Sequence, residues 1–475
     1  MKAKKNNSQR IYHDAIAKFD GDLIKTYYKR GKTYLKLQDY TAAIRDFNTV
    51  LELNPQHIKA YLIRGYTYGE MKNFSQEIAD YTEAIRLAPE LAKAYRSRGY
   101  ACGILQDYEA AIADLTKAIE LDPNYTQAYY NRACINNLIK KYPQALTDFT
   151  KVIELDADNT AAYYHRGSIY SLLDKHQQAI ADLTSAIDLD PNQHQAYCKR
   201  ANARSILQHH REAIIDYSQA VLLNPRDWQS IYDQGNEYLN IKDYSNALAS
   251  YTKTIRLQPK LIPAYKNRGF VYGKLKKFDL AIADYSAVLR LDSNDAEAFY
   301  HRGNAYNYLE QYHQAIIEYN RCISINSDRG MLFDTGQGTN DYHNVYYNLG
   351  VSYSCLGEYQ KAIALYDRAV AITPKSALIY NNRGNVYRKL VRYHNAISDY
   401  TQAIFYDPDY SHAYYNRGLL YHLMEKKHKS IKDLTLAANL FKKQGKNSLA
   451  EEVFTTIKAL HGDRQLLDIR SDTVI

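Results

Sequence analysis

Cysteine is scarce in this sequence of 475 residues, and its five cysteines include no Cys-x-x-Cys pair. Their number is odd, and each replaces another residue within a helical apolar pattern: Cys102, Cys134, Cys198, Cys322 and Cys355. A disulfide framework would need an even set at regular spacings. We interpret the cysteines as small apolar fillers in a reducing compartment.

Long apolar runs are also lacking. The N-terminal stretch MKAKKNNSQRIY is basic, but no apolar stretch of signal-peptide length follows it. No run in the sequence is long enough to cross a bilayer. We therefore predict a cytoplasmic protein without membrane insertion.

Motifs that carry catalysis are absent as well. The fifteen histidines show neither H-x-x-x-H nor H-E-x-x-H spacing, and the sequence has no P-loop and no G-x-S-x-G. We predict that the protein is not an enzyme, binds no metal and needs no cofactor.

Net charge is +9, and it is carried by the two ends. Residues 1–57 hold 11 basic and 6 acidic side chains, residues 411–475 hold 11 and 7, and the 353 residues between them are neutral overall. Binding of nucleic acid along the whole length would need a continuous basic stripe. We predict no nucleic-acid partner; RNA binding, the third possibility, would show an affinity that falls steeply with salt.

Repetition is the main positive feature of the sequence. The 48 tyrosines recur in register with glycines, alanines and arginines at a period of 34 residues. Twelve units of 34 residues align without internal gaps, nine in 24–329 and three in 343–444. Such a period predicts an array of similar supersecondary units.

Each unit carries two apolar stripes with helical spacing. We number the places of each unit from its first residue. In the first stripe, place 4 is aromatic in eleven units, place 8 is Gly or Ala and place 11 is usually Tyr. In the second stripe, place 20 is Ala in ten units, place 24 is Tyr, Phe or Leu and place 27 is small. Polar breaks separate the stripes, and eight units have Pro near the end. The pattern predicts helix, tight turn, helix and stop, in pairs that must stack to bury a core.

This arrangement of aromatic, Gly or Ala, Tyr, Ala, aromatic, Ala and Pro resembles the tetratricopeptide repeat over 408 of the 475 residues. The resemblance implies an all-α solenoid: a right-handed superhelix of stacked antiparallel helix pairs. It also implies that the first helices line a concave groove that binds other proteins.

On this basis we divide the chain into five segments: 1–23, a basic tail with a partial capping helix; 24–329, repeats 1–9; 330–342, a Gly-rich insertion loop; 343–444, repeats 10–12; and 445–475, a capping helix and a polar tail. For the insertion, a hinge or a loop over the groove is the alternative to a tolerated surface loop.

An arginine recurs at place 7, within the core-facing stripe, and a carboxylate recurs at place 23. Ten units have both residues; repeats 7 and 10 have neither. This covariation favours an ion pair within each unit over a ladder of positive charge for an acidic ligand. Examples are Arg30 with Asp46, Arg268 with Asp284 and Arg383 with Asp399.

The resemblance implies that places 2, 5, 6, 9 and 12 of the first helices line the groove. Basic residues dominate there in repeats 1–3, and amides and tyrosines dominate later, which favours an extended peptide with an acidic segment at the N-terminal end of the groove. A merely solvated helix face is the alternative. The candidates are Lys29, Lys32, Arg96, Asn131, Asn202, Lys266, Asn267, Tyr300, Asn304, Tyr347, Asn348, Asn381, Asn382, Asn385 and Asn416.

One variant of such grooves clamps a C-terminal carboxylate with Lys, Asn and Arg side chains from three consecutive repeats. Starting from Lys266, the next two positions hold Phe270 and His301, so we exclude this clamp. Our leading hypothesis is a non-catalytic scaffold that holds a partner segment. The alternative is a sensory regulator that closes around a small peptide or metabolite.

Overall fold

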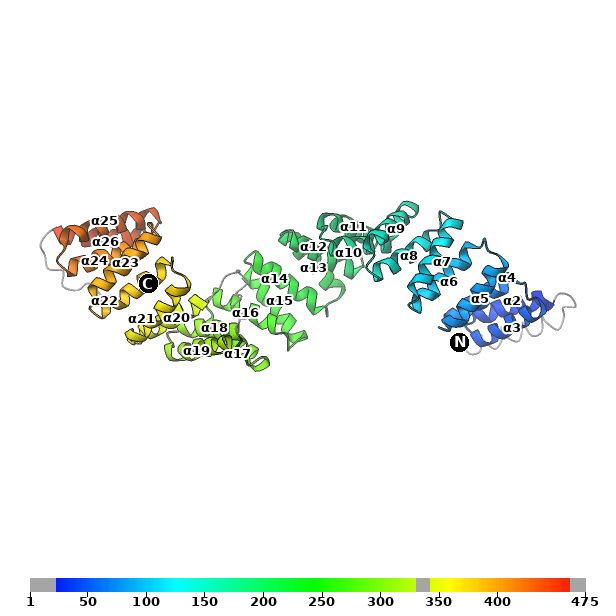
Figure 1. Cartoon of the computed structure of the whole chain (residues 1–475), viewed down its shortest axis with the longest axis horizontal. Helices are drawn as coiled ribbons and strands as arrows, with labels where there is room; N and C mark the ends of the chain where they lie inside the picture. Colours follow the sequence, from blue (N-terminus) through cyan, green and yellow to red (C-terminus); the bar gives the residue numbers. More distant parts are fainter. Residues whose placement is uncertain (1–22, 330–341, 462–475) are drawn as a thin grey trace. The chain divides into compact units, whose positions relative to one another are not determined.

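The computed structural model describes residues 23–329 and 342–461, and every element within these two ranges is an α-helix (Figure 1). Most of the predicted N-terminal cap, residues 330–341 of the predicted loop at 330–342 and the predicted polar tail after residue 461 lie outside the described residues. Tyr342, which we placed in the loop, begins a helix. None of the described helices is both long and apolar enough to cross a membrane.

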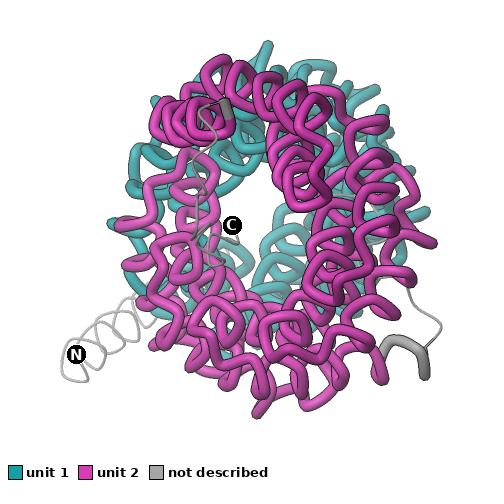
Figure 2. The backbone as a smooth tube through the Cα atoms, turned by 90° about the vertical axis from the view of Figure 1, so that its left-hand side faces the viewer, with its two compact units in different colours: residues 1–230 teal, residues 231–475 magenta. Residues whose placement is uncertain are grey.

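The chain divides into two compact units, residues 1–230 and 231–475, which Figure 2 colours separately. The helices of the first unit are α2 (Leu23–Lys36), α3 (Tyr40–Leu53), α4 (Ile58–Glu70), α5 (Phe74–Leu87), α6 (Ala92–Ile104), α7 (Tyr108–Leu121), α8 (Thr126–Leu138), α9 (Tyr142–Leu155), α10 (Thr160–Leu172), α11 (His176–Leu189), α12 (His194–Ile206) and α13 (His210–Leu223).

Helix α14 (Trp228–Asn240) begins in the last three residues of the first unit and continues into the second. The other helices of the second unit are α15 (Tyr244–Leu257), α16 (Ile262–Lys274), α17 (Phe278–Leu291), α18 (Ala296–Tyr308), α19 (Tyr312–Arg329), α20 (Tyr342–Cys355), α21 (Tyr359–Ile372), α22 (Ala377–Lys389), α23 (Tyr393–Tyr406), α24 (Ser411–Leu423), α25 (Lys427–Lys443) and α26 (Asn447–His461).

Successive helices within each unit pack in pairs, and each pair packs on the next. Helix α6 packs on α7 and α24 on α25, while α11 contacts α12 and α17 contacts α18 across neighbouring pairs. A single pair buries too little apolar surface to be stable alone, so the stack supplies the core. The predicted all-α solenoid of stacked helix pairs is confirmed.

A residue in the left-handed backbone conformation, with positive φ, follows the first helix of each described repeat at place 15. Gln38 has φ 60°, and the same place has φ between 57° and 77° in all twelve repeats, although only one of these residues is a glycine, Gly357. The next residue often caps the second helix; Asp39, for example, accepts a hydrogen bond from the Ala42 amide. The turn is therefore set by local backbone geometry and capping.

Close approach of the two helices explains the small residues at places 8 and 20. A Cβ atom on Gly99 would lie 3.0 Å from both the Ala111 carbonyl oxygen and the Leu115 Cγ atom. Ala111 and Leu115 are fully buried. A side chain at position 99 would therefore push α6 away from α7.

A bidentate ion pair joins the two helices of ten repeats. Arg30 donates from Nε to Asp46 Oδ2 at 2.7 Å and from Nη2 to Oδ1 at 2.6 Å. The fork geometry suits a planar guanidinium. The structure brings together the other nine predicted pairs in the same way: Arg64–Asp80, Arg98–Asp114, Arg132–Asp148, Arg166–Asp182, Arg200–Asp216, Arg268–Asp284, Arg302–Glu318, Arg383–Asp399 and Arg417–Asp433.

The guanidinium also contacts the preceding repeat, which the sequence analysis did not predict. Arg268 donates from Nη1 to the Thr252 hydroxyl of repeat 7 at 3.1 Å. Equivalent bonds reach place 25 of the preceding repeat from eight other arginines: Arg64, Arg98, Arg132, Arg166, Arg200, Arg302, Arg383 and Arg417. In nine repeats the recurring arginine therefore contacts the preceding repeat as well as the carboxylate of its own helix pair.

Repeat 10 replaces the ion pair with apolar packing. Leu349 is 1% exposed, and Leu365 packs against the same cluster. Replacing both partners of a buried ion pair with apolar groups is often energetically neutral. Repeat 10 is therefore a natural example of a repeat in which two leucines replace the arginine and the carboxylate.

Candidate functional site

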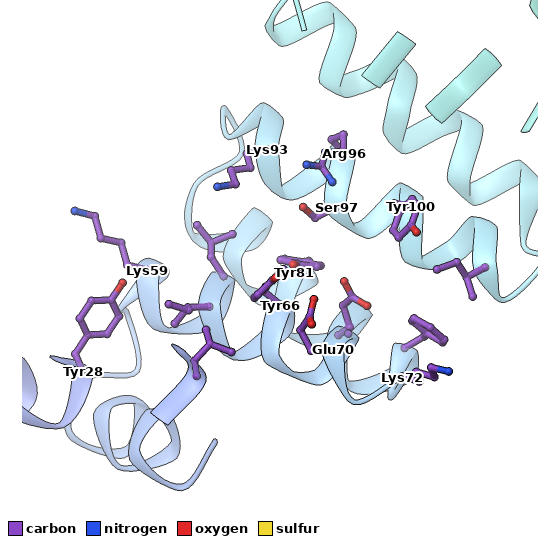
Figure 3. Close-up of a pocket in the computed structure, with 17 residues that line it drawn as sticks. Tyr28, Lys59, Tyr66, Glu70, Lys72, Tyr81, Lys93, Arg96, Ser97 and Tyr100 are labelled. Carbon is purple, nitrogen blue, oxygen red and sulfur yellow. The ribbon is translucent and has the colours of Figure 1, made fainter. Parts of the chain in front are cut away.

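A cavity of the first unit lies against the first helices of repeats 1 to 3 (Figure 3). It has a volume of about 800 Å³, and α2, α4, α5 and α6 contribute its walls. Four basic and two acidic side chains line it: Lys59, Lys72, Lys93, Arg96, Glu70 and Glu77. The excess of positive charge suits an acidic ligand.

The predicted basic residues differ in their relation to this cavity. Arg96 lines it, and its Nε donates to the Tyr125 hydroxyl at 3.3 Å. Lys29 and Lys32 are exposed on α2, where Lys32 Nζ lies 5.9 Å from the centre of the Tyr28 ring. Tyr28 itself lines the cavity, so Lys32 lies beside the cavity on the side of repeat 1.

Glu77 is the unusual residue of this cavity. It occupies place 20, where ten repeats have Ala, and it is only 7% exposed. A Cβ atom on Gly69 would lie 2.6 Å from Glu77 Oε2, so the glycine makes room for the carboxyl group. Burial raises the pKa of Glu77 to about 7, against the opposing effect of the Arg96 charge.

A second cavity, of about 720 Å³, lies in the second unit against α16, α17 and α18. The predicted residues Tyr300 and Asn304 line it, together with aromatic and basic side chains. The rings of Phe278 and Tyr308 stack there with their centroids 4.9 Å apart. This cavity therefore combines flat aromatic surface with polar groups, as ligand sites commonly do.

A third cavity, of about 50 Å³, lies against α22, α24 and α26. Asn381, Asn385 and Asn416 of the predicted set line it. Asn381 is 2% exposed and accepts a hydrogen bond from Asn416 Nδ2 at 2.9 Å.

Most of the predicted amide side chains form hydrogen bonds with one another or with tyrosine hydroxyls. Asn267 Nδ2 donates to the Tyr232 hydroxyl at 3.0 Å and to Asn236 Oδ1 at 2.9 Å. Asn236 Oδ1 also accepts from the hydroxyl of Tyr251 on the second helix, at 2.9 Å. The motif recurs when Asn348 donates to Asn304 Oδ1 and to Tyr300, and Tyr319 donates to Asn304.

Other predicted residues make related internal contacts. Asn382 Nδ2 donates to the Tyr347 hydroxyl at 2.6 Å, and Asn385 Oδ1 accepts from Tyr400 at 2.8 Å. Asn202 accepts from the Tyr217 hydroxyl. We call this set of amides and tyrosines the amide row. A ligand on this surface would have to extend or displace bonds of the amide row.

Lys266 and Asn131 of the predicted set also fall outside the amide row. Lys266 Nζ lies 2.7 Å from Asp295 Oδ2 and 2.6 Å from Glu297 Oε2, so its charge is neutralised locally. Burial alone would raise the pKa of Glu297, but hydrogen bonds from His301 and Lys266 lower it to about 2. Asn131 is 7% exposed; its Oδ1 accepts from Gln127, and its Nδ2 is buried without a hydrogen-bond partner.

Sequence reasoning missed Asn236 and the second-helix tyrosines of the amide row. A signal was present, because Asn at place 9 occurs in four repeats and each of them has Tyr at place 24: Asn202 with Tyr217, Asn236 with Tyr251, Asn304 with Tyr319 and Asn385 with Tyr400. The covariation that revealed the ion pairs could have revealed these bonds too.

Solved structures of similar fold include YrrB, described as a TPR protein with an unusual peptide-binding site, at 24% identity over 39% of this chain and 95% of that chain with a TM-score of 0.37. The C-terminal part of a TPR repeat-containing protein from Cytophaga hutchinsonii is 17% identical over 50% and 98% of the two chains, with a TM-score of 0.46. The Cut9–Hcn1 hetero-tetramer of APC/C matches 94% and 98% at 14% identity, with a TM-score of 0.40. These likenesses show the fold alone.

No curated protein matches the sequence. Family models described as TPR or tetratricopeptide repeats, however, match most of it, at residues 24–57, 58–91, 92–125, 115–147, 160–193, 194–227, 229–261, 262–295, 296–329, 355–391, 384–424 and 411–444. Together with the stacked helix pairs, these matches show that the chain belongs to the tetratricopeptide repeat family.

Proposed function

We propose that the protein is a non-catalytic scaffold that holds an extended segment of a partner protein against the first helices of its repeats. One observation carries the proposal: in the second unit, side chains at places 5, 6 and 9 of successive first helices bond to one another and form most of the amide row. Groups that are already ordered lose little entropy when a ligand binds. Tyrosine adds contact area at low entropic cost.

The cavity of the first unit supports the idea of an acidic segment at the N-terminal end. Lys59, Lys93 and Arg96 line it, and only Glu70 and Glu77 oppose their charge. Because the pKa of Glu77 is raised to about 7, part of its population is neutral at physiological pH. We propose that a segment rich in Asp and Glu binds here.

The test uses fluorescent peptides of equal length, one rich in Asp and Glu and the other carrying Asn and Gln instead. We expect the acidic peptide to bind more tightly and to lose affinity as salt rises. Combined replacement of Lys59, Lys93 and Arg96 with Ala should abolish this preference. A matched triple Ala variant of three exposed second-helix lysines, Lys117, Lys253 and Lys432, should keep it. Equal binding of both peptides to the wild type would refute the proposed acidic specificity.

One observation favours the alternative of a regulator that closes around a small ligand. The cavity against α4 and α6 has a volume of about 800 Å³, which is the size of pockets that enclose small molecules. A small ligand that raises the melting temperature and reduces the radius of gyration in solution scattering would support this second function. The cytoplasmic location and the lack of a nucleic-acid partner stay predictions from the sequence.

A further inference from the structure

Three side chains of types that commonly ligate metals cluster in repeat 6, outside the three cavities described above and the amide row. His194 opens α12, Cys198 follows one helical turn later, and Asp227 directly precedes α14. The i to i+4 spacing places His194 and Cys198 on one face of α12. The chain returns after 29 more residues to bring Asp227 to the same face.

The three ligand atoms converge. His194 Nε2 lies 3.0 Å from Asp227 Oδ2 and 3.5 Å from Cys198 Sγ, and Cys198 Sγ lies 3.7 Å from Asp227 Oδ2. With typical zinc bonds, tetrahedral coordination separates nitrogen from oxygen by about 3.4 Å and sulfur from either by about 3.6 Å. The observed separations thus match three edges of a tetrahedral zinc site with only small adjustments.

Neighbouring groups orient the carboxylate. Ser230 Oγ donates to Asp227 Oδ2 at 2.5 Å, and the Gln229 amide donates to Oδ1 at 3.2 Å. Outer-shell hydrogen bonds of this kind hold metal ligands in place. The side chains of His194 and Asp227 are 24% and 18% exposed, so an ion can reach them from solvent.

The cluster departs from the repeat pattern. Cysteine occupies place 5 in repeat 6 alone, and no other repeat combines histidine at place 1 with aspartate at place 34. Residues that only support the stack recur at the same places along the array, as the arginines do. A set that occurs once points to a local function.

We propose that His194 Nε2, Cys198 Sγ and the Asp227 carboxylate bind one divalent zinc-class cation, with water in the fourth position. Imidazole and thiolate favour zinc and cobalt over magnesium or calcium, which prefer oxygen ligands. The thiol releases its proton to solvent as the Cys198 sulfur binds the ion. We predicted no metal from the histidine spacings alone. The His-x-x-x-Cys pair of this cluster needs an aspartate that only the fold brings near.

Cobalt titration of the untagged, reduced full-length protein tests the proposal, because a thiolate ligand produces a charge-transfer band in the near ultraviolet. We expect one equivalent of Co²⁺ to bind and Zn²⁺ to displace it. Cys198→Ser should abolish the band, and Asp227→Asn should weaken binding at least tenfold. Ser230→Ala should weaken it about tenfold, which is typical of an outer-shell partner. Ca²⁺ and Mg²⁺ should not compete.

The matched control is Cys355→Ser, which removes an exposed cysteine far along the sequence and should leave the band unchanged. Far-ultraviolet circular dichroism of the metal-free variants checks that each one folds. If Cys198→Ser did not fold, Asp227→Asn and Ser230→Ala would still decide the question. The proposal is overturned if no saturable band forms, if the band survives Cys198→Ser, or if Cys355→Ser removes it.

Discussion

At the scale of single residues, the buried carboxyl group of Glu77 sets a pH dependence. Its folded-state pKa of about 7 exceeds the ordinary value of 4.5, chiefly because of burial. Between these two pH values the folded protein binds more protons than the unfolded chain does at this site. The stability contributed by the neutral carboxyl group is therefore complete below about pH 4.5 and is lost as the pH rises to about 7.

We predict that Glu77→Gln flattens this dependence. The wild type should lose up to about 3 kcal/mol of unfolding free energy at this site between pH 4.5 and 7, since each pKa unit corresponds to about 1.4 kcal/mol. Urea unfolding of both proteins at pH 5 and pH 8 measures the difference. Parallel losses in wild type and variant would contradict the assignment.

The Arg268–Asp284 pair permits a second prediction at the same scale. Arg268→Leu leaves Asp284, which is 4% exposed, without its partner and should cost about 3 to 5 kcal/mol. Arg268→Leu combined with Asp284→Leu should cost less, because repeat 10 tolerates leucine at both places. Thermal and urea unfolding report the two losses. Identical melting of the single and double variants would show that the charges do not stabilise each other.

At the scale of the helix pair, one turn residue fits its conformation poorly. Val391 has φ 62° between α22 and α23, a region that disfavours β-branched side chains. The equivalent residue between α20 and α21 is Gly357, with φ 77°. The same turn recurs in every described repeat, so the turn itself is not unusual. The strain comes from the β-branched side chain of Val391.

We predict that Val391→Gly stabilises the protein by about 1 kcal/mol, because relief of the strain outweighs the entropy gained by the unfolded chain. The reciprocal change Gly357→Val should destabilise it by a similar amount. Melting temperatures of the two variants measure the effects. A lower melting temperature for Val391→Gly would contradict the strain.

At the scale of the whole array, each repeat contacts mainly its neighbours. A substitution that destabilises one repeat should therefore destabilise the adjacent repeats most. Gly99→Val would force a side chain against the Ala111 carbonyl oxygen and loosen α6 from α7. We predict faster amide hydrogen exchange in α4 to α9, with a loss of about 1 to 3 kcal/mol there. Protection in α10 to α13 should change much less.

The control for this prediction is Gly273→Ala in α16, where an added Cβ would have no side-chain atom and no atom of another helix within 4 Å. Alanine favours helix over glycine by about 1 kcal/mol, so this variant should exchange no faster than the wild type. If amide hydrogen exchange became uniformly faster over the whole first unit in Gly99→Val, the unit would instead unfold as one cooperative block.

The sequence by itself determined the features that every repeat shares. The 34-residue period, the two helical stripes and the coupled loss of Arg and Asp in repeats 7 and 10 were sufficient to predict the stacked helix pairs and to pair Arg30 with Asp46. Such contacts can be inferred because twelve repeats share one geometry, so residues that touch are kept or lost together from one repeat to another.

Only the tertiary structure decided the contacts that belong to particular repeats. It joined Asn267 to Asn236 and Tyr232 and brought Asp227 beside His194 and Cys198. These side chains meet across neighbouring helices, where the packing of one repeat on the next sets the distances. The 34-residue period describes only what the repeats have in common, so it cannot report contacts that occur in single repeats.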